Sequence, residues 1–308
     1  MVFAVGNHTV QSLRVLCIGT VALVLAGFAP PSVIGDVFGD SATPIATTNV
    51  GLPGGVASPA LDAPAQGDPV AELYNAGLEK LKSGSYKAAA KSFAEVERQH
   101  PYSKWATKAL LMQAFANYQR NAYDDAINAA ERFITLHPGH KDTAYAYYLT
   151  AISQYEQIND VRRDQSRTQK ALDALEEVSR RFPQSPYAAD AAKKSNLARD
   201  HLAAKEMDVG RYYLKKGSYL AGINRFKKVV TDYQTTSQVP EALYRLTEGY
   251  MALGVVSEAQ TAAAVLGQNF PNSQWYKDAY TIVSTDGQQP VENQSSWISR
   301  TFKKLNPL

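Results

Sequence analysis

The chain has 308 residues, of which 45% are hydrophobic and 20% charged, a composition typical of a globular protein. Its net charge of +3 is too small for the strongly basic surface of most nucleic-acid-binding domains, so we expect no nucleic-acid partner. A single cysteine, Cys17, excludes an internal disulfide and a cysteine-based metal cage.

Residues 1–29 have the pattern of a signal peptide. An apolar run of 14 residues, Val15–Phe28, follows Arg14. This run is shorter than the roughly 20 residues of a membrane-spanning helix and fits the hydrophobic region of a secretory signal. A cleaved or lipidated signal peptide is the leading interpretation; an uncleaved anchor or a misassigned start codon are the alternatives. Cys17 lies at the start of the run rather than after it, so no lipid-attachment residue is evident.

Residues 30–71 are rich in Pro, Gly, Ala, Ser and Thr and carry few charges. Such a composition cannot build a packed core and is typical of a flexible tether. We expect this tether to hold the rest of the chain at a distance from a membrane.

Residues 72–283 contain a repeating pattern of two helices per unit. A break between helices recurs with a spacing of 37 residues, both from Gly84 to Asn121 and from Gly217 to Gly254. Two prolines that close successive units, Pro101 and Pro138, are also 37 residues apart. A fixed period in this range indicates a tandem array. We therefore predict an all-α fold of about five tetratricopeptide-type hairpins, stacked into a curved superhelix.

The third and fourth units depart from this spacing. Pro138 and Pro183 are 45 residues apart, which places an insertion of 8 residues within residues 157–167. The first helix of the fourth unit should be unusually long, about residues 187–216, because its first half contains no Pro or Gly.

Residues 284–308 form a polar tail that ends in a short amphipathic segment, residues 297–305. An apolar stripe of Trp, Ile, Phe and Leu lies beside Arg300, Lys303 and Lys304. This pattern suits a helix on a membrane surface or on a partner, or equally a tail that folds back on the last repeat.

The chain shows no catalytic constellation. His137 and His140 flank a Pro-Gly turn, whereas a helical metal pair needs both rings on one face. Paired acidic residues such as Glu176 and Glu177 are expected on solvated helix faces. We find neither a glycine-rich phosphate loop nor a nucleophile elbow. We therefore expect a protein that is not an enzyme and has no catalytic residues, no metal site and no cofactor.

The ordered set of motifs resembles the BamD family of outer-membrane assembly factors over about residues 68–284. The insertion in the third repeat and the long helix of the fourth make the resemblance specific. The motifs that carry it are Gly84-Ser-Tyr86, Arg132-Phe-Ile-x-Leu-x-Pro138, Asp164-Gln-x-x-Thr168 and Arg181-Phe-Pro-x-Ser-x-Tyr-Ala-x-Asp190.

The resemblance implies a scaffold at the periplasmic face of the bacterial outer membrane that helps to fold and insert β-barrel proteins. The amino-terminal repeats would receive unfolded β-barrel proteins. The carboxy-terminal repeats would dock the POTRA region of BamA, alongside other subunits of the barrel-assembly complex. The family's docking arginine lies in a hydrophobic-Asn-Arg motif that matches Ile223-Asn224-Arg225, so Asn224 and Arg225 are the expected docking residues.

Two other interpretations compete with this one. Another periplasmic tetratricopeptide adaptor, of the type that coordinates the Tol–Pal system, usually begins with a coiled coil, whereas residues 29–69 have no heptads and many prolines. An enzyme with accessory repeats would need a catalytic domain, for which the tether and tail are too short. For Arg225 itself, the alternative is an ordinary solvated helix arginine.

Overall fold

The computed structural model describes residues 69–285 and 287–305. The predicted signal peptide, 1–29, and most of the predicted tether, 30–68, lie outside the described residues. Within the described part every regular element is an α-helix, which confirms the all-α prediction. The helices are α1 (Pro69–Lys82), α2 (Tyr86–Gln99), α3 (Lys104–Gln119), α4 (Tyr123–Leu136), α5 (Thr143–Tyr155), α6 (Ser166–Arg181), α7 (Ala188–Lys215), α8 (Tyr219–Asp232), α9 (Val239–Ala252), α10 (Val256–Asn269), α11 (Gln274–Thr285) and α12 (Trp297–Leu305).

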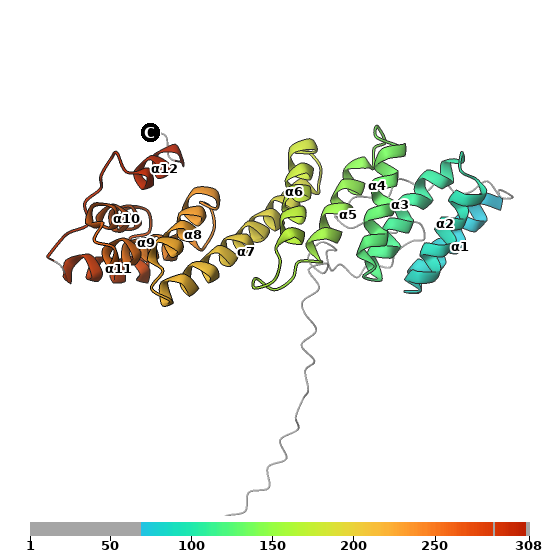
Figure 1. Ribbon diagram of the computed structural model, residues 1–308. Coiled ribbons are helices and arrows are strands. Elements are labelled where there is room, and N and C mark those ends of the chain that lie inside the picture. The colour runs from blue at the N-terminus through green and yellow to red at the C-terminus, as the bar shows by residue number, and fades with distance from the viewer. Residues whose placement is uncertain (1–68, 286, 306–308) are drawn as a thin grey trace, which may run out of the picture.

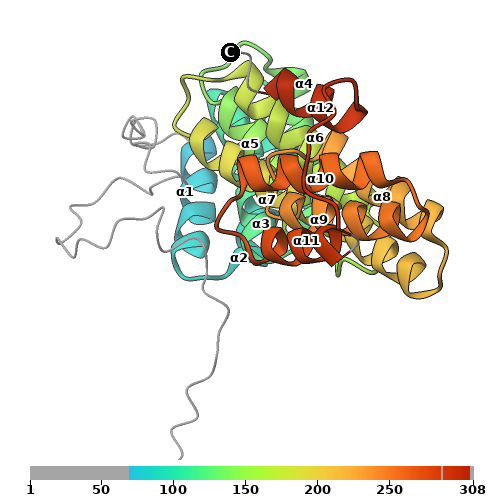
Figure 2. The ribbon, with the colours of Figure 1, turned by 90° about the vertical axis from the view of Figure 1, so that its left-hand side faces the viewer.

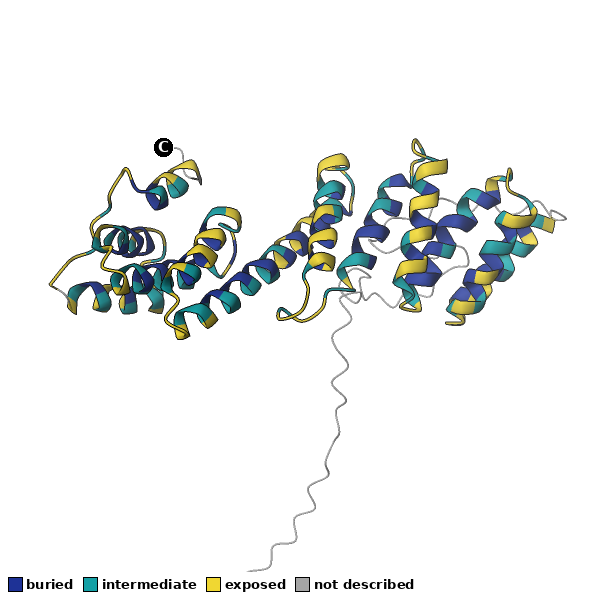
Figure 3. Ribbon diagram, in the orientation of Figure 1, coloured by how far each residue is buried: buried dark blue, intermediate teal, exposed yellow. Residues whose placement is uncertain are grey.

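The first ten helices form five successive hairpins, as the repeat period predicts. Each helix packs against the one before it and the one after it, and first helices of neighbouring hairpins also touch across α1, α3, α5 and α7. The result is an elongated array (Figure 1), and the view along its length shows α8–α10 displaced sideways from α1–α5 (Figure 2). Buried residues follow the sides of the helices that meet, and exposed residues lie on the outer sides and turns (Figure 3).

Four of the five hairpins turn through the same backbone structure. In the first hairpin the amide of Gly84 donates to the carbonyl of Leu81 at 3.0 Å, and the amide of Ser85 donates to that of Lys80 at 2.8 Å. This is a Schellman motif, which needs a left-handed residue after the helix. The residues with positive φ at these four turns are Gly84, Asn121, Gly217 and Gly254, at 61° to 74°.

The third hairpin has the predicted insertion in place of a tight turn. Gln165 organises the loop 156–165, because its side-chain amide donates to three loop carbonyls at 3.0 to 3.1 Å. Lys205 of α7 donates to the carbonyl of Arg162 at 2.9 Å, and the ring of His201 lies 3.1 Å from Gln165 Oε1. The loop therefore braces the middle of α7.

Helix α7 has 28 residues and matches the predicted long helix. Its first half packs on α6 and its second half on α8. Two hydrophobic cores meet at this helix: one contains residues from Ala71 to Ala191, and the other contains residues from Ala203 to Ile298. A small cluster joins them: Leu172, Ala198 and Leu202.

Close packing within two hairpins depends on glycine opposite phenylalanine. A Cβ atom on Gly77 would lie 2.7 Å from the ring of Phe93, and one on Gly210 would lie 2.5 Å from the ring of Phe226. Both rings are fully buried. The second hairpin solves the same problem differently, because alanines occupy both equivalent positions. In the first and fourth hairpins, the phenylalanine ring of the second helix thus fills the space left by the glycine of the first helix.

We expect Gly210→Ala to lower the free energy of unfolding by about 1–3 kcal/mol, because the added methyl overpacks Phe226. Phe226→Ala alone should cost about 3–5 kcal/mol through the cavity it leaves. The double variant should be more stable than the sum of the two losses predicts, since each change removes the other's partner. Denaturant unfolding measures all three. Gly139→Ala is the matched control, because a Cβ atom at this position would meet no neighbouring atom. If the two losses of stability were strictly additive in the double variant, the packing argument would be contradicted.

Candidate functional site

The predicted docking residues lie on the outer face of α8. Helix α8 buries Ile223, Phe226, Val229 and Val230 at helical spacing against the core of the carboxy-terminal repeats. The opposite face is open to solvent, and its exposed side chains comprise one apolar, one amide and three basic groups. They are Leu220, Asn224, Arg225, Lys227 and Lys228.

Arg225 is held by a buried carboxylate of the preceding helix. Its Nη1 donates to Glu206 Oε2 at 3.0 Å, while Lys228 Nζ donates to Glu206 Oε1 at 2.7 Å. The side chain of Glu206 is 11% exposed, whereas those of Arg225 and Lys228 are 44% and 45% exposed. One buried acceptor thus orders two half-exposed cations on the surface of α8.

The electrostatics of this cluster favour its charged form. Burial acts to raise the pKa of Glu206, but the hydrogen bonds from Lys228 and Arg225 outweigh it, so the pKa lies below the ordinary glutamate value. The hydrogen bond to Glu206 in turn raises the pKa of Lys228. Glu206 therefore remains a carboxylate, and Lys228 remains charged, throughout the neutral range.

Asn224, next to Arg225 in the chain, is exposed and makes no side-chain hydrogen bond to any described residue. Its amide is free to donate and accept toward a partner. Leu220, one turn earlier on α8, is 66% exposed. The structure therefore places the two predicted docking residues, Asn224 and Arg225, together on one accessible surface.

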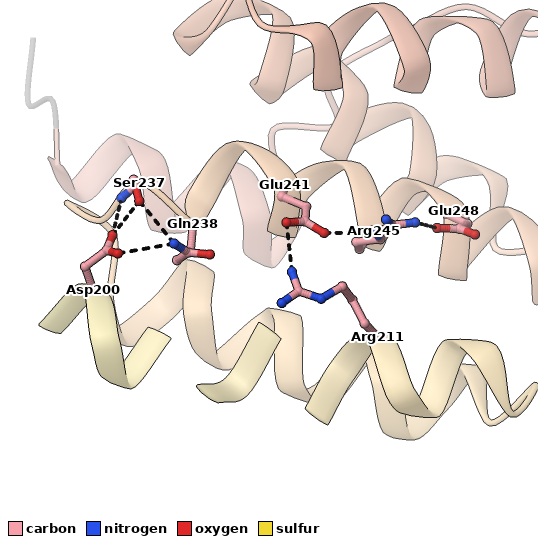
Figure 4. A network of polar contacts seen from close by, with 7 residues as sticks. All are labelled: Asp200, Arg211, Ser237, Gln238, Glu241, Arg245 and Glu248. Atoms are coloured by element: carbon pink, nitrogen blue, oxygen red, sulfur yellow. Dashed lines mark hydrogen bonds and ion pairs between the residues drawn. The ribbon is translucent and has the colours of Figure 1, made fainter. Parts of the chain in front are cut away.

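Polar contacts between α7 and α9 fix the helices that carry this surface (Figure 4). Asp200 accepts from the amide and the hydroxyl of Ser237 at 2.8 and 2.6 Å, just before α9 begins. A carboxylate is favoured there because the amino-terminal end of a helix carries a partial positive charge. Further along, Glu241 binds Arg211 at 2.9 Å and Arg245 at 3.3 Å.

The tail helix α12 lies against the flank of α8. Trp297 donates from Nε1 to the hydroxyl of Tyr250 at 3.2 Å, and Lys227 Nζ lies 4.9 Å from the centre of the Trp297 ring. Ile298 is fully buried. Ser296, at the start of α12, donates to Glu258 at 2.7 Å. Helix α12 is thus folded back on α8 and α10 (Figure 1).

A second open feature lies on the amino-terminal repeats. A groove of about 360 Å³ runs between α2 and α4, with α3 as its floor. Lys87, Lys91, Arg120 and Arg132 line it, with Asp125 as the acidic residue. Arg120 pairs with that aspartate at 2.5 Å, and Arg132 pairs with a glutamate of α2. Lys87 and Lys91 make no ion pair with a described residue, so the groove has an excess of positive charge.

The two histidines singled out in the sequence lie beside the ring of Phe133. The His137 ring centre is 5.4 Å and the His140 ring centre 5.5 Å from it. Among the described residues there is no group of three or more His, Cys, Asp or Glu side chains placed to hold a metal ion. Nor does any helix of this part combine the length and hydropathy of a membrane span.

Sequence reasoning missed Glu206 and Lys228. Lys228 follows Arg225 by three residues, which is one helical turn, and this spacing could have indicated it. Glu206 belongs to another helix, 19 residues earlier, and only the packing of α7 on α8 brings its carboxylate to Arg225.

Comparison with known proteins identifies the family. The family profile described as YfiO, outer membrane lipoprotein, matches residues 66–266. A protein of Caulobacter vibrioides named outer membrane protein assembly factor BamD is 49% identical over 223 residues, which are 72% of this chain and 73% of the relative. The chain belongs to the BamD family. A BamD of Rickettsia prowazekii is 48% identical over 70% of this chain and 86% of the relative.

More distant members of the BamD family align over a similar region. One from Neisseria meningitidis serogroup A is 35% identical and covers 68% of this chain and 83% of the relative. The family profile includes all of α8 and therefore the Ile223-Asn224-Arg225 motif. It ends at residue 266, before α11 and α12 begin.

The pairing of Glu206 with Arg225 and Lys228 predicts that the stability of the fold depends on pH. A glutamate whose folded-state pKa is lowered contributes stability that is present above its unfolded pKa and lost as the pH falls through the folded value. At neutral pH we expect Glu206→Gln to be less stable than the wild type by about 1 kcal/mol, because both cations are half exposed. The difference should shrink below the unfolded glutamate pKa of 4.5. Thermal unfolding of both proteins between acidic and neutral pH measures this difference in stability. A difference that does not change with pH would contradict the proposed pairing of Glu206 with the two cations.

Proposed function

We propose that the chain is a non-enzymatic scaffold of the barrel-assembly complex at the periplasmic face of the outer membrane. In this role it docks the POTRA region of BamA through α8 and receives unfolded β-barrel proteins on its amino-terminal repeats. Membership of a family of outer membrane protein assembly factors supports the general role. One observation carries the docking site: the buried carboxylate of Glu206 presents Arg225 on an otherwise open helix face.

The geometry suits a partner carboxylate. A guanidinium has five N–H donors in a rigid plane, and the contact with Glu206 engages Nη1. The remaining donors are available at the surface. Because Glu206 also holds Lys228, both side chains are ordered before binding, which lowers the entropy cost of docking. Asn224 adds a neutral donor and acceptor beside them.

The groove between α2 and α4 supports substrate receipt at the other end of the array. It is open, and its unpaired Lys87 and Lys91 favour a polypeptide segment that carries negative charge. The helices that line the groove pack in the first hydrophobic core, whereas α8 packs in the second. A substrate and BamA would therefore occupy separate surfaces, which is what a scaffold that joins two components requires.

Arg225→Glu should weaken BamA co-purification from detergent-solubilised envelopes by roughly ten-fold or more, because it places a carboxylate beside Glu206 and faces the partner with the wrong charge. Arg180→Glu, an exposed arginine of α6, is the matched control and should leave recovery unchanged. Helical content by circular dichroism should match the wild type for both variants. Normal BamA recovery with Arg225→Glu would sink the docking assignment, and recovery of Tol–Pal components in place of BamA would favour the alternative adaptor role.

Lys87→Glu combined with Lys91→Glu should weaken binding of an unfolded β-barrel protein by several-fold, since the groove loses its excess positive charge. Binding of the purified BamA POTRA region should not change, because the two lysines lie on α2, far along the array from α8. Substrate binding is measured by fluorescence anisotropy with a labelled, urea-denatured β-barrel protein diluted into buffer. Binding of the POTRA region is measured by calorimetry. Unchanged substrate binding would remove the groove from the proposal.

A further inference from the structure

The tail helix α12 carries three exposed cations on its outer side: Arg300, Lys303 and Lys304. Its inner side is used for packing, with Ile298 and Ser299 fully buried and Trp297 and Phe302 packed against the second core. The helix lies beyond the end of the family match at residue 266. The surface of α12 therefore lies outside the part of the chain that the family profile matches.

Helical spacing places two of these cations in line with the residue of α12 that contacts α8. Arg300 and Lys304 follow Trp297 by three and seven residues, so they lie along the same side of the helix as the ring that contacts Lys227 of α8. Lys303 follows Ser299 by four residues and lies nearer the side where the Ser299 hydroxyl donates to the carbonyl of Asn293 at 2.9 Å.

A continuous basic band results on α8 and α12. Lys227 connects the two helices through its contact with Trp297, 4.9 Å from the ring centre. On the other side of Lys227 lie Asn224, Lys228 and Arg225 of the same exposed face. Three carboxylates lie next to the band: Glu206 is tied to Arg225 and Lys228, Asp232 acts electrostatically on Lys228, and Glu258 accepts from Ser296. The band consists of Arg225, Lys227, Lys228, Arg300 and Lys304, a clear excess of positive charge.

We propose that α12 extends the docking surface of α8, so that Arg300 and Lys304 bind acidic side chains of the partner that docks at Arg225. This inference rests on the proposed function, because it assigns a second row of contacts to the same partner. Charge complementarity and continuity with the Arg225 surface point to an acidic face of a folded protein.

A lipid surface fits these observations less well. Amphipathic helices bind membranes by burying an apolar face among the acyl chains. In α12 that face is already occupied, because Ile298 is fully buried and Trp297 is bound to Tyr250 and Lys227. Among the described side chains of α12, the exposed ones are the charged groups of Arg300, Lys303 and Lys304.

The test is the affinity of the full chain for the purified BamA POTRA region, measured by calorimetry at low and physiological salt. Arg300→Glu combined with Lys304→Glu should weaken binding by about ten-fold and reduce its salt dependence. Lys303→Glu is the control: it reverses one cation of α12 on the side of Ser299, which is half the charge change of the double variant, and it should stay within about two-fold of wild type. Circular dichroism and thermal unfolding should show each variant folded.

Arg225→Glu separates this inference from the proposed function. Weak binding by Arg225→Glu with normal binding by the α12 double variant would overturn the role of α12 and leave the docking proposal standing. Equal weakening by Lys303→Glu would also overturn it, because the effect would then be one of net charge. Binding of the wild type to anionic phosphatidylglycerol vesicles, lost in the double variant while POTRA affinity is unchanged, would assign the band to lipid and overturn the inference.

Discussion

Stacking is the constraint on which the whole array depends, because a single helical hairpin has too little interior to bury its own apolar face. Each hairpin must present a surface that fits the next one, and close helix approach makes this possible. The rings of Phe93 and Phe226 occupy the space that a Cβ atom would take on Gly77 and Gly210. Schellman turns then give four of the five hairpins the same geometry, so one local solution is used repeatedly along the array.

Helix α8 shows how such a regular array acquires a specific surface. Its inner face follows the repeat pattern, and its outer face is free to vary. A buried charge without partners destabilises a fold. The carboxylate of Glu206 avoids this cost because Arg225 and Lys228 both bind it. The same contacts limit the movement of the two cations. The buried carboxylate on α7 thereby orders the exposed cations on α8, and the tail helix α12 packs against α8.

The sequence predicted what depends on local rules. Breaks between helices, spaced by 37 residues in two pairs, predicted the hairpins, and a long stretch without Pro or Gly predicted α7. The position of Arg225 on α8 followed from its motif, but its partner did not, because pairing with Glu206 depends on how two helices pack. The orientation of α12 was open for the same reason: an apolar stripe fits a membrane, a partner or the chain's own repeats.

One consequence of the shared helix α7 concerns distance. Its 28 residues span about 42 Å at the rise of an α-helix, and the loop 156–165 braces its middle. Helix α7 therefore joins the two hydrophobic cores as a stiff rod rather than as a flexible linker. An extended polypeptide covers about 3.4 Å per residue, so roughly twelve extended residues would match the length of α7. The spacing of the two cores along the array is thus fixed by a single helix.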